Sequence, residues 1–188
     1  MTDPSDKRLQ TTKILVSAEQ IQKRVQELAR KISQDYAGRK VTIVCVLENG
    51  FIFAADLVRH LEMPVLCRFV RAEVKEIPGS VPTREIYFAP NVPVSGEDVL
   101  IVEAILQSGQ TSEFLIRNMM GRGAASVKLV TLLDKQKARR VALQPDYFGF
   151  VLDESFAVGY GMGAPDVGRN LPYIAAVPGI AASEPKEP

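Results

Sequence analysis

The sequence predicts an α/β fold, a mainly parallel twisted sheet flanked by helices. Short continuous apolar runs recur along the chain, and such runs are typical of strands that are covered on both faces. Segments with helical periodicity separate these runs, and this alternation favours parallel strands joined by helices. The 188 residues, 46% of them hydrophobic, are enough for one domain with a sizeable core.

The first helix is predicted to begin after Ser17. Ser17 and Gln20 form a capping box, and Val16 and Ile21 form a hydrophobic staple across it. Gly38 fits the end of this helix. The apolar stripe that follows the cap consists of Ile21, Val25, Leu28, Ala29 and Ile32.

The other elements alternate along the chain. We expect helices over residues 51–61 and 111–120, the second closed by Gly121. Ligands of parallel sheets bind at the carboxyl ends of the strands. The strands are predicted over residues 42–47, 65–70, 99–102, 126–133, 146–152 and 156–158.

A single domain is expected over residues 13–179, with disordered ends at 1–12 and 180–188. Residues 73–97 hold four prolines and little periodicity, so we interpret them as a lid-like loop over the active site. The alternative is an ordinary surface loop. Within this loop, residues 83–88 are predicted to form one arm of a hairpin.

Composition excludes several classes of protein. A net charge of +1 argues against a broad nucleic-acid or membrane surface, and no apolar run is long enough to span a bilayer. The polar N-terminal segment does not resemble a signal peptide, so we expect a cytoplasmic protein. Cys45 and Cys67 lie in apolar runs and are predicted to be buried free thiols. His60 is the only histidine, which argues against a Cys/His metal site.

The clearest functional pattern is V-L-I-V-E-A-I-L-Q-S-G-Q-T, residues 99–111. An apolar strand runs into a loop with one acid, Glu103, and the loop leads through a glycine flanked by hydroxyl residues into an amphipathic helix. Backbone N–H groups, small hydroxyls and a helix N-terminus together favour an anion. We therefore predict a phosphate site, with a plain strand-to-helix turn as the alternative. Its residues are Ser108, Gly109, Gln110 and Thr111.

Several segments, in order, resemble the hypoxanthine-guanine phosphoribosyltransferases, which are type I phosphoribosyltransferases. The likeness spans about residues 15–177 and implies that family's fold, with a small C-terminal hood region. It also implies the conversion of a free purine and phosphoribosyl pyrophosphate into a nucleotide and pyrophosphate. The segments are V-L-E-N-G-F-I-F-A-A-D-L (46–57), the phosphate pattern (99–111), L-L-D-K (132–135), D-Y-F-G-F (146–150), F-A-V-G-Y-G-M-G (156–163) and R-N-L-P-Y (169–173).

The resemblance implies roles for the purine and ribose contacts. Lys135 matches the lysine that holds the purine 6-oxo oxygen, and the alternative is a solvated lysine in a basic run. Phe156 matches the aromatic that stacks on the purine, unless it is simply a core residue, and Ala157 offers backbone groups to the base edge. Glu103 and Ala104 fall at the ribose position.

The resemblance also implies a pyrophosphate loop, formed by Glu48, Asn49 and Gly50. Arg169 matches an arginine near the pyrophosphate, and an ordinary ion pair with an acid is the alternative. Glu48 stands where the family often has a lysine, and its carboxylate repels pyrophosphate. Residues 71–75 lack the Ser-Tyr pair of the family's lid.

Three family acids are replaced. Gln107 stands at the general-base position, and losing a base removes about 10²–10⁴-fold of rate. Ala104 replaces an Asp that pairs with the ribose hydroxyls, and Gly163 replaces an Asp that helps to hold Mg²⁺-pyrophosphate. We therefore expect no required cofactor, and Mg²⁺ only if the protein is catalytically active.

These replacements favour a protein that binds a purine nucleotide such as GMP or IMP, with weak or no transferase activity and a regulatory role. One alternative is an active hypoxanthine/guanine phosphoribosyltransferase of purine salvage. Another is an interaction subunit that joins an active paralogue. The resemblance implies a homodimer or homotetramer. A transcriptional regulator is disfavoured, because residues 1–12 are too few for a DNA-binding module.

Overall fold

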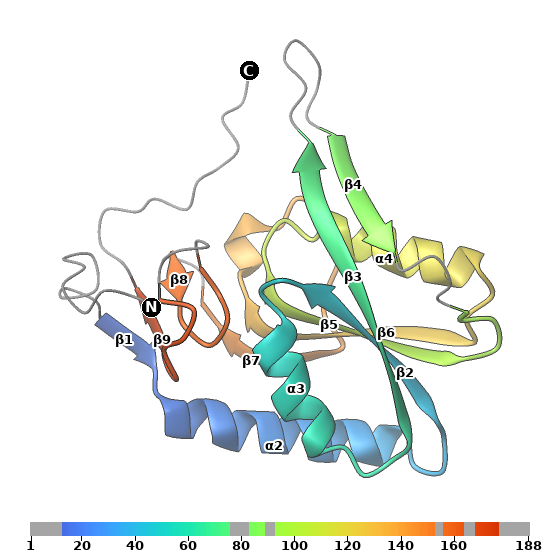
Figure 1. The fold of residues 1–188 in the computed structure, drawn as a ribbon, viewed down its shortest axis with the longest axis horizontal. Coiled ribbons are helices and arrows are strands. Elements are labelled where there is room, and N and C mark those ends of the chain that lie inside the picture. The colour runs from blue at the N-terminus through green and yellow to red at the C-terminus, as the bar shows by residue number, and fades with distance from the viewer. Residues whose placement is uncertain (1–12, 76–82, 89–92, 153–155, 164–167, 177–188) are drawn as a thin grey trace.

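A six-stranded sheet forms the centre of the computed structural model, which describes residues 13–75, 83–88, 93–152, 156–163 and 168–176 (Figure 1). The strand order is β4-β3-β2-β5-β6-β7. Strands β3, β2, β5, β6 and β7 are parallel, and β4 pairs antiparallel with β3 at the edge. The predicted, mainly parallel α/β fold is confirmed. The strands are β2 (Val41–Leu47), β3 (Val65–Lys75), β4 (Thr83–Phe88), β5 (Asp98–Leu106), β6 (Ser126–Asp134) and β7 (Tyr147–Val151).

A second, antiparallel sheet lies beside the first and has the order β1-β9-β8 (Figure 1). It joins the start of the described chain to its end, since Lys13 of β1 pairs with Ala176 of β9. This sheet is the small C-terminal region that the resemblance implied. Its strands are β1 (Lys13–Val16), β8 (Ala157–Val158) and β9 (Ile174–Ala176).

Helices cover both faces of the main sheet. The helices are α2 (Ala18–Asp35), α3 (Phe51–Arg59) and α4 (Gln110–Gly121), with a short 3₁₀ turn η1 (Gln136–Ala138). Alternate residues of β5 divide between two apolar clusters: Leu100 and Val102 pack with residues of α2 and α3, whereas Val99 and Ile101 pack with residues of α4. The core therefore has two layers, one on each face of the sheet.

The capping box at the start of α2 is confirmed. The Gln20 backbone N–H donates to the Ser17 hydroxyl at 3.3 Å, and the Ser17 N–H donates to Oε1 of Gln20 at 2.8 Å. Val16 and Ile21, the predicted staple pair, are both buried in the same apolar cluster. The predicted stripe of α2 is also buried, so this helix was readable from the sequence alone.

Strand β5 is longer than predicted, because its pairing with β6 continues from Asp98 as far as Leu106, which lies opposite Asp134. Glu103 and Ala104 are consequently strand residues on opposite faces of the sheet, rather than loop residues. Ala104 is 1% exposed and packs in the cluster of α2 and α3.

The predicted hairpin arm at 83–88 is confirmed as β4, which pairs with a β3 that continues to Lys75. The remainder of the predicted lid includes residues 76–82 and 89–92, which lie outside the described residues, so the lid stays a prediction. The predicted disordered ends, 1–12 and 180–188, also lie outside them.

The two thiols are free, but only one is buried. Burial raises the pKa of Cys45 to about 12. Cys67 is exposed, so the expectation of two buried cysteines is wrong for this residue. The reason is that α3 packs on β2 and β5 and leaves part of β3 uncovered. Among the helices of the described chain, none has the length and apolar character needed to cross a membrane.

Candidate functional site

The predicted phosphate loop lies at the carboxyl edge of the main sheet, between the end of β5 and the start of α4. Gly109 is the N-cap of α4 and has a φ of 80°, a left-handed conformation that glycine adopts without strain. A Cβ at this position would lie 2.9 Å from Cγ2 of Val141 and 3.1 Å from Cδ of Arg139. Backbone conformation and space therefore both require a glycine here.

Residues 134–140, which begin with the last residue of β6, hold this loop, and we refer to them as the clamp. Three successive carbonyls of the loop accept hydrogen bonds from the clamp. The Leu106 carbonyl accepts from the Lys135 N–H at 2.9 Å, and the Ser108 carbonyl accepts from the Arg140 N–H at 3.0 Å. Between them, Nη1 of Arg139 donates to the Gln107 carbonyl at 3.1 Å.

The clamp orients the peptide groups of the loop. In a trans peptide the carbonyl and the following N–H point in opposite directions. Because the carbonyls of residues 106–108 face the clamp, the N–H groups of residues 107–109 point away from it. Successive N–H groups with one direction form an anion-binding concavity, and the N-terminus of α4 adds its partial positive charge.

A buried ion pair holds the clamp itself together. Asp134 is fully buried and pairs with the guanidinium of Arg139, and the two side chains are only 1% and 10% exposed. The second oxygen of Asp134 accepts from Nε2 of Gln136 at 3.1 Å. Sequence reasoning counted Arg139 only as part of a basic run and missed this pair. The available signal was the acid that ends the apolar run of β6.

Lys135, the predicted purine contact, directly follows β6 and is 5% exposed. The alternative of a solvated lysine is therefore wrong, whereas its contact with a purine stays a prediction. Phe156 is half-buried against the small sheet, and Ala157 is a buried residue of β8. Their roles toward a base also stay predictions.

The residues at the predicted ribose and general-base positions differ in their surroundings. Glu103 accepts a hydrogen bond from the Ser112 hydroxyl in the first turn of α4. Gln107 is exposed in the phosphate loop, whereas Ala104 is packed in the core. Glu103 of β5 therefore contacts α4, whereas the methyl group of Ala104 is buried.

The predicted pyrophosphate loop follows β2, after a cis peptide between Leu47 and Glu48. Oε1 of Glu48 lies 3.3 Å from Nη2 of Arg71, and its Oε2 lies 3.6 Å from Nη1 of Arg169. The other terminal nitrogen of Arg169 donates to the Gly163 carbonyl at 3.1 Å. The ion pair that we gave as the alternative for Arg169 is therefore present, with Glu48 as its acid.

The described residues do not fit a resident metal site. Within the described ranges, no group of three or more His, Cys, Asp or Glu side chains comes together that could hold a metal ion. Gly163, at the position of the family's metal-holding acid, has no side chain, and its carbonyl accepts from Arg169. We therefore assign no chemical step to Mg²⁺.

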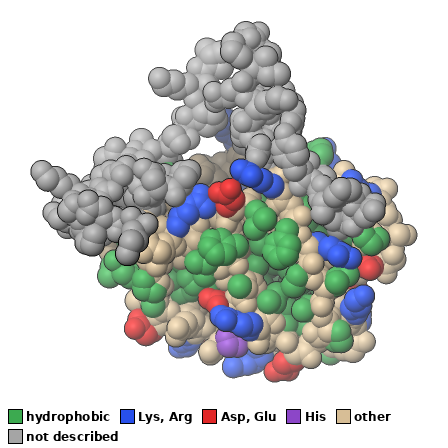
Figure 2. Space-filling model, viewed as in Figure 1, with side chains coloured by type: hydrophobic (Ala, Val, Ile, Leu, Met, Phe, Trp, Pro, Cys, Tyr) green, Lys and Arg blue, Asp and Glu red, His purple; other side chains and the backbone are tan. Residues whose placement is uncertain are grey.

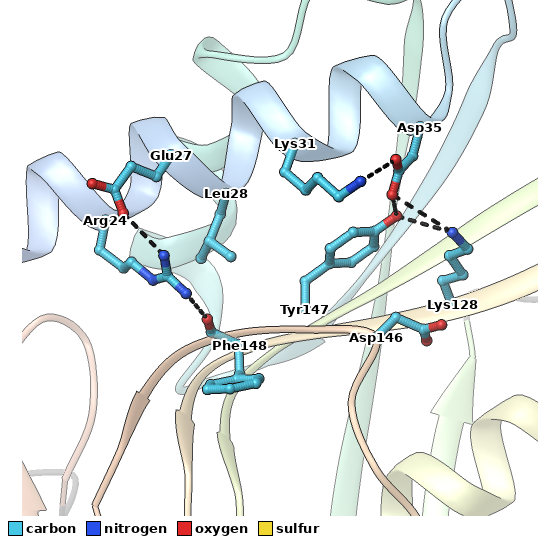
Figure 3. Close-up of a pocket in the computed structure, with 9 residues that line it drawn as sticks. All are labelled: Arg24, Glu27, Leu28, Lys31, Asp35, Lys128, Asp146, Tyr147 and Phe148. Atoms are coloured by element: carbon cyan, nitrogen blue, oxygen red, sulfur yellow. Dashed lines mark hydrogen bonds and ion pairs between the residues drawn. The ribbon is translucent and has the colours of Figure 1, made fainter.

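A pocket of about 290 Å³ lies at the opposite edge of the sheet, between α2 and the starts of β6 and β7 (Figure 3). Its polar groups bind one another. The Tyr147 hydroxyl donates to Asp35 at 2.8 Å, and Nζ of Lys128 donates to Tyr147 at 3.0 Å. Hydrogen bonds from Lys31 and Tyr147 lower the pKa of Asp35, and burial raises the pKa of Tyr147. This network joins α2 to β7, and we interpret it as structural.

The comparisons with known proteins agree with this fold. Residues 11–164 match the phosphoribosyl transferase domain. The bifunctional protein TilS/HprT of Listeria innocua is 39% identical over 164 residues, which are 86% of this chain and 25% of that protein, so the chain spans a quarter of that relative. The hypoxanthine-guanine phosphoribosyltransferase of Bacillus subtilis is 35% identical over 168 residues, which cover 88% of this chain and 92% of the relative.

The solved structures extend the match to three dimensions. A hypoxanthine-guanine phosphoribosyltransferase from Bacillus anthracis superposes with a TM-score of 0.81 at 38% identity, covering 88% of this chain and 96% of the other. Sequence and architecture thus match over nearly the whole length of both chains. The chain belongs to the phosphoribosyltransferase family, and within it to the hypoxanthine-guanine group of the type I fold.

Proposed function

We propose that the protein is a hypoxanthine/guanine phosphoribosyltransferase of purine salvage. The observation that carries this proposal is the clamped loop, whose N–H groups at residues 107–109 suit the 5′-phosphate of a nucleotide. The relatives that match almost end to end are named as enzymes of this activity. Lys135, buried beside this loop, is the proposed contact of the purine 6-oxo group.

In the proposed reaction a ring nitrogen of the purine bonds to the anomeric carbon, and pyrophosphate leaves with the electrons of the broken bond. The purine also loses a proton, which passes to water. Gln107 has no useful basicity, so we expect the rate to rest on alignment and on stabilisation of charge rather than on a protein base at this position.

A turnover assay tests the proposal. Hypoxanthine, phosphoribosyl pyrophosphate and Mg²⁺ are mixed with the protein, and nucleotide formation is followed by absorbance. Turnover of about 1 s⁻¹ or more supports an active enzyme. Turnover below about 10⁻³ s⁻¹ contradicts it, because that rate is far under the ordinary range.

A second candidate is a nucleotide-binding protein with weak or no transfer. The replacement of three family acids by Gln107, Ala104 and Gly163 favours it specifically. Calorimetry with GMP and IMP, run beside the turnover assay, separates the two. Tight binding without turnover supports this second candidate, whereas no binding at millimolar nucleotide and no turnover contradict both.

We propose further that nucleotide binding needs no metal ion. The anion contacts that we assign are backbone N–H groups of the loop, which act without a metal. The affinity for GMP is then expected to be equal in EDTA and in Mg²⁺. A large gain in Mg²⁺ would contradict this proposal.

We propose a second copy of the chain as the partner of one apolar face. Phe51 of α3 is 48% exposed and Phe69 of β3 is 50% exposed. Figure 2 shows hydrophobic side chains gathered on the face where α3 and β3 lie. Sedimentation should give a dimer or tetramer, and Phe69→Lys should shift it toward the monomer. A monomeric wild type would contradict the proposal.

A further inference from the structure

The loop that follows β2 shares an edge of the sheet with the phosphate loop. Strand β2 lies between β3 and β5, with Leu47 opposite Arg71 on one side and Cys45 opposite Val102 on the other. A Cβ on Gly50 would lie 2.6 Å from the Val46 carbonyl and 3.5 Å from the Val102 carbonyl. The loop is therefore packed against the strand that leads into the phosphate loop.

Three charged side chains, Glu48, Arg71 and Arg169, meet on this loop, and we call them the Glu48 cluster. Each carboxylate oxygen of Glu48 faces a different guanidinium, at 3.3 Å for Arg71 and 3.6 Å for Arg169. The arginines come from separate elements, one from β3 and the other from the segment before β9. Two guanidinium groups that converge on one anion form the arrangement that phosphate oxygens also favour.

The exposures of the three side chains differ. Arg169 is 23% exposed, whereas Glu48 is 53% exposed and Arg71 is 55% exposed. The hydrogen bond from Arg169 to the Gly163 carbonyl also holds its guanidinium in place. A half-exposed carboxylate moves toward solvent more readily than a guanidinium that is held on two sides.

We infer that the Glu48 carboxylate is an internal counter-ion of Arg71 and Arg169, and that it thereby weakens the binding of a diphosphate group at the predicted pyrophosphate loop. The inference rests on the proposed function, because it assumes that a diphosphate approaches the edge that holds the phosphate loop. A diphosphate carries several negative charges, so it must displace this carboxylate or be repelled by it. A monophosphate bound at residues 108–111 does not need the cluster.

Calorimetry with inorganic pyrophosphate and, separately, with GMP tests the inference. Glu48→Gln keeps the shape of the side chain and removes its charge. We expect this variant to bind pyrophosphate about 10-fold more tightly than the wild type, with GMP affinity changed less than about twofold. An unchanged or weaker affinity for pyrophosphate overturns the inference.

The matched control is Glu27→Gln, which removes the same charge from a partly exposed pair with Arg24 on α2, away from the N-terminus of α4. An equal gain in this control would show an effect of net charge and would overturn the inference. Adding Arg169→Gln to Glu48→Gln should abolish the gain, and a gain that persists also overturns it. Thermal unfolding of each variant shows that the fold is retained.

The two proposals fail in different ways. GMP binding without any pyrophosphate gain in Glu48→Gln overturns the counter-ion and leaves the proposed function standing. A pyrophosphate gain without GMP binding in either protein contradicts the proposed nucleotide site and supports the counter-ion.

Discussion

The two edges of the main sheet use charged residues in opposite ways. At the carboxyl edge, the buried pair of Asp134 and Arg139 holds the Gln107 carbonyl, so the pair orients the backbone of the loop that we propose as a phosphate site. At the amino edge, Asp35, Tyr147 and Lys128 bind one another across the pocket of Figure 3. The charged pair at the carboxyl edge orients the backbone of a candidate binding site, whereas the charged network at the amino edge joins α2 to β7.

The largest expected effect comes from Asp134→Asn, which leaves the buried guanidinium of Arg139 without its carboxylate. Breaking a buried pair in this way lowers the free energy of unfolding by about 3 kcal/mol. The clamp then loosens, and calorimetry should show GMP affinity lowered at least about 10-fold. Glu113→Gln, in an exposed pair on α4, should change the free energy of unfolding by less than about 0.5 kcal/mol. Equal effects of the two variants would contradict the role of the clamp.

The next effect is that of Gly109→Ala. An alanine in the left-handed conformation costs about 1–2 kcal/mol, and its methyl group would meet the side chain of Val141. We expect weaker GMP binding together with this loss in urea-induced unfolding. Gly121→Ala is the control, since a Cβ there meets no atom within 4 Å. A larger loss of stability in Gly121→Ala than in Gly109→Ala would show that the close contact of Gly109 with Val141 is unimportant.

At the amino edge, Tyr147→Phe removes the hydroxyl that donates to Asp35 and accepts from Lys128. Losing these hydrogen bonds should lower the free energy of unfolding by about 1 kcal/mol. GMP affinity should stay within the error of the calorimetry, because this network lies at the edge opposite the phosphate loop. A parallel loss of GMP affinity would remove the distinction between the two edges.

The smallest effect is that of Asp35→Asn, and it depends on pH. The pKa of Asp35 is lowered in the folded protein, so ionised Asp35 stabilises the fold above its unfolded pKa, near 3.8. This contribution is lost as the pH falls below 3.8 through the folded pKa. Urea unfolding should therefore show wild type more stable than the variant by about 0.5 kcal/mol at pH 7, with a smaller difference below pH 3.8. A constant difference would contradict the assignment to Asp35.

Local patterns predicted the elements that local interactions build. The capping box and apolar stripe identified α2, and the continuous apolar runs identified β2 and β6. Strands β1 and β9 were not predicted, because each has only three or four residues and their pairing joins Lys13 to Ala176. No short-range pattern reports such a pairing.

The candidate site shows the same limit. The glycine and hydroxyl pattern predicted a loop between a strand and a helix, and the structure puts these residues between β5 and α4 at the carboxyl edge of the sheet. Their binding of a phosphate stays a prediction. The clamp was missed because it depends on the register of β5 against β6, which sets Leu106 opposite Asp134. The Arg169–Glu48 contact joins residues that are 121 positions apart, so the sequence offered it only as one alternative.

The depth of Ala104 has a consequence for any attempt to rebuild the missing acids. Gln107 is exposed, so an aspartate there would stay hydrated and would change the free energy of unfolding little. An aspartate in place of Ala104 would enter an apolar layer, where an ionised carboxylate lacks water unless neighbouring side chains rearrange. The two substitutions therefore differ in cost. Gln107→Asp changes an exposed residue, whereas Ala104→Asp also requires the surrounding apolar side chains to be changed.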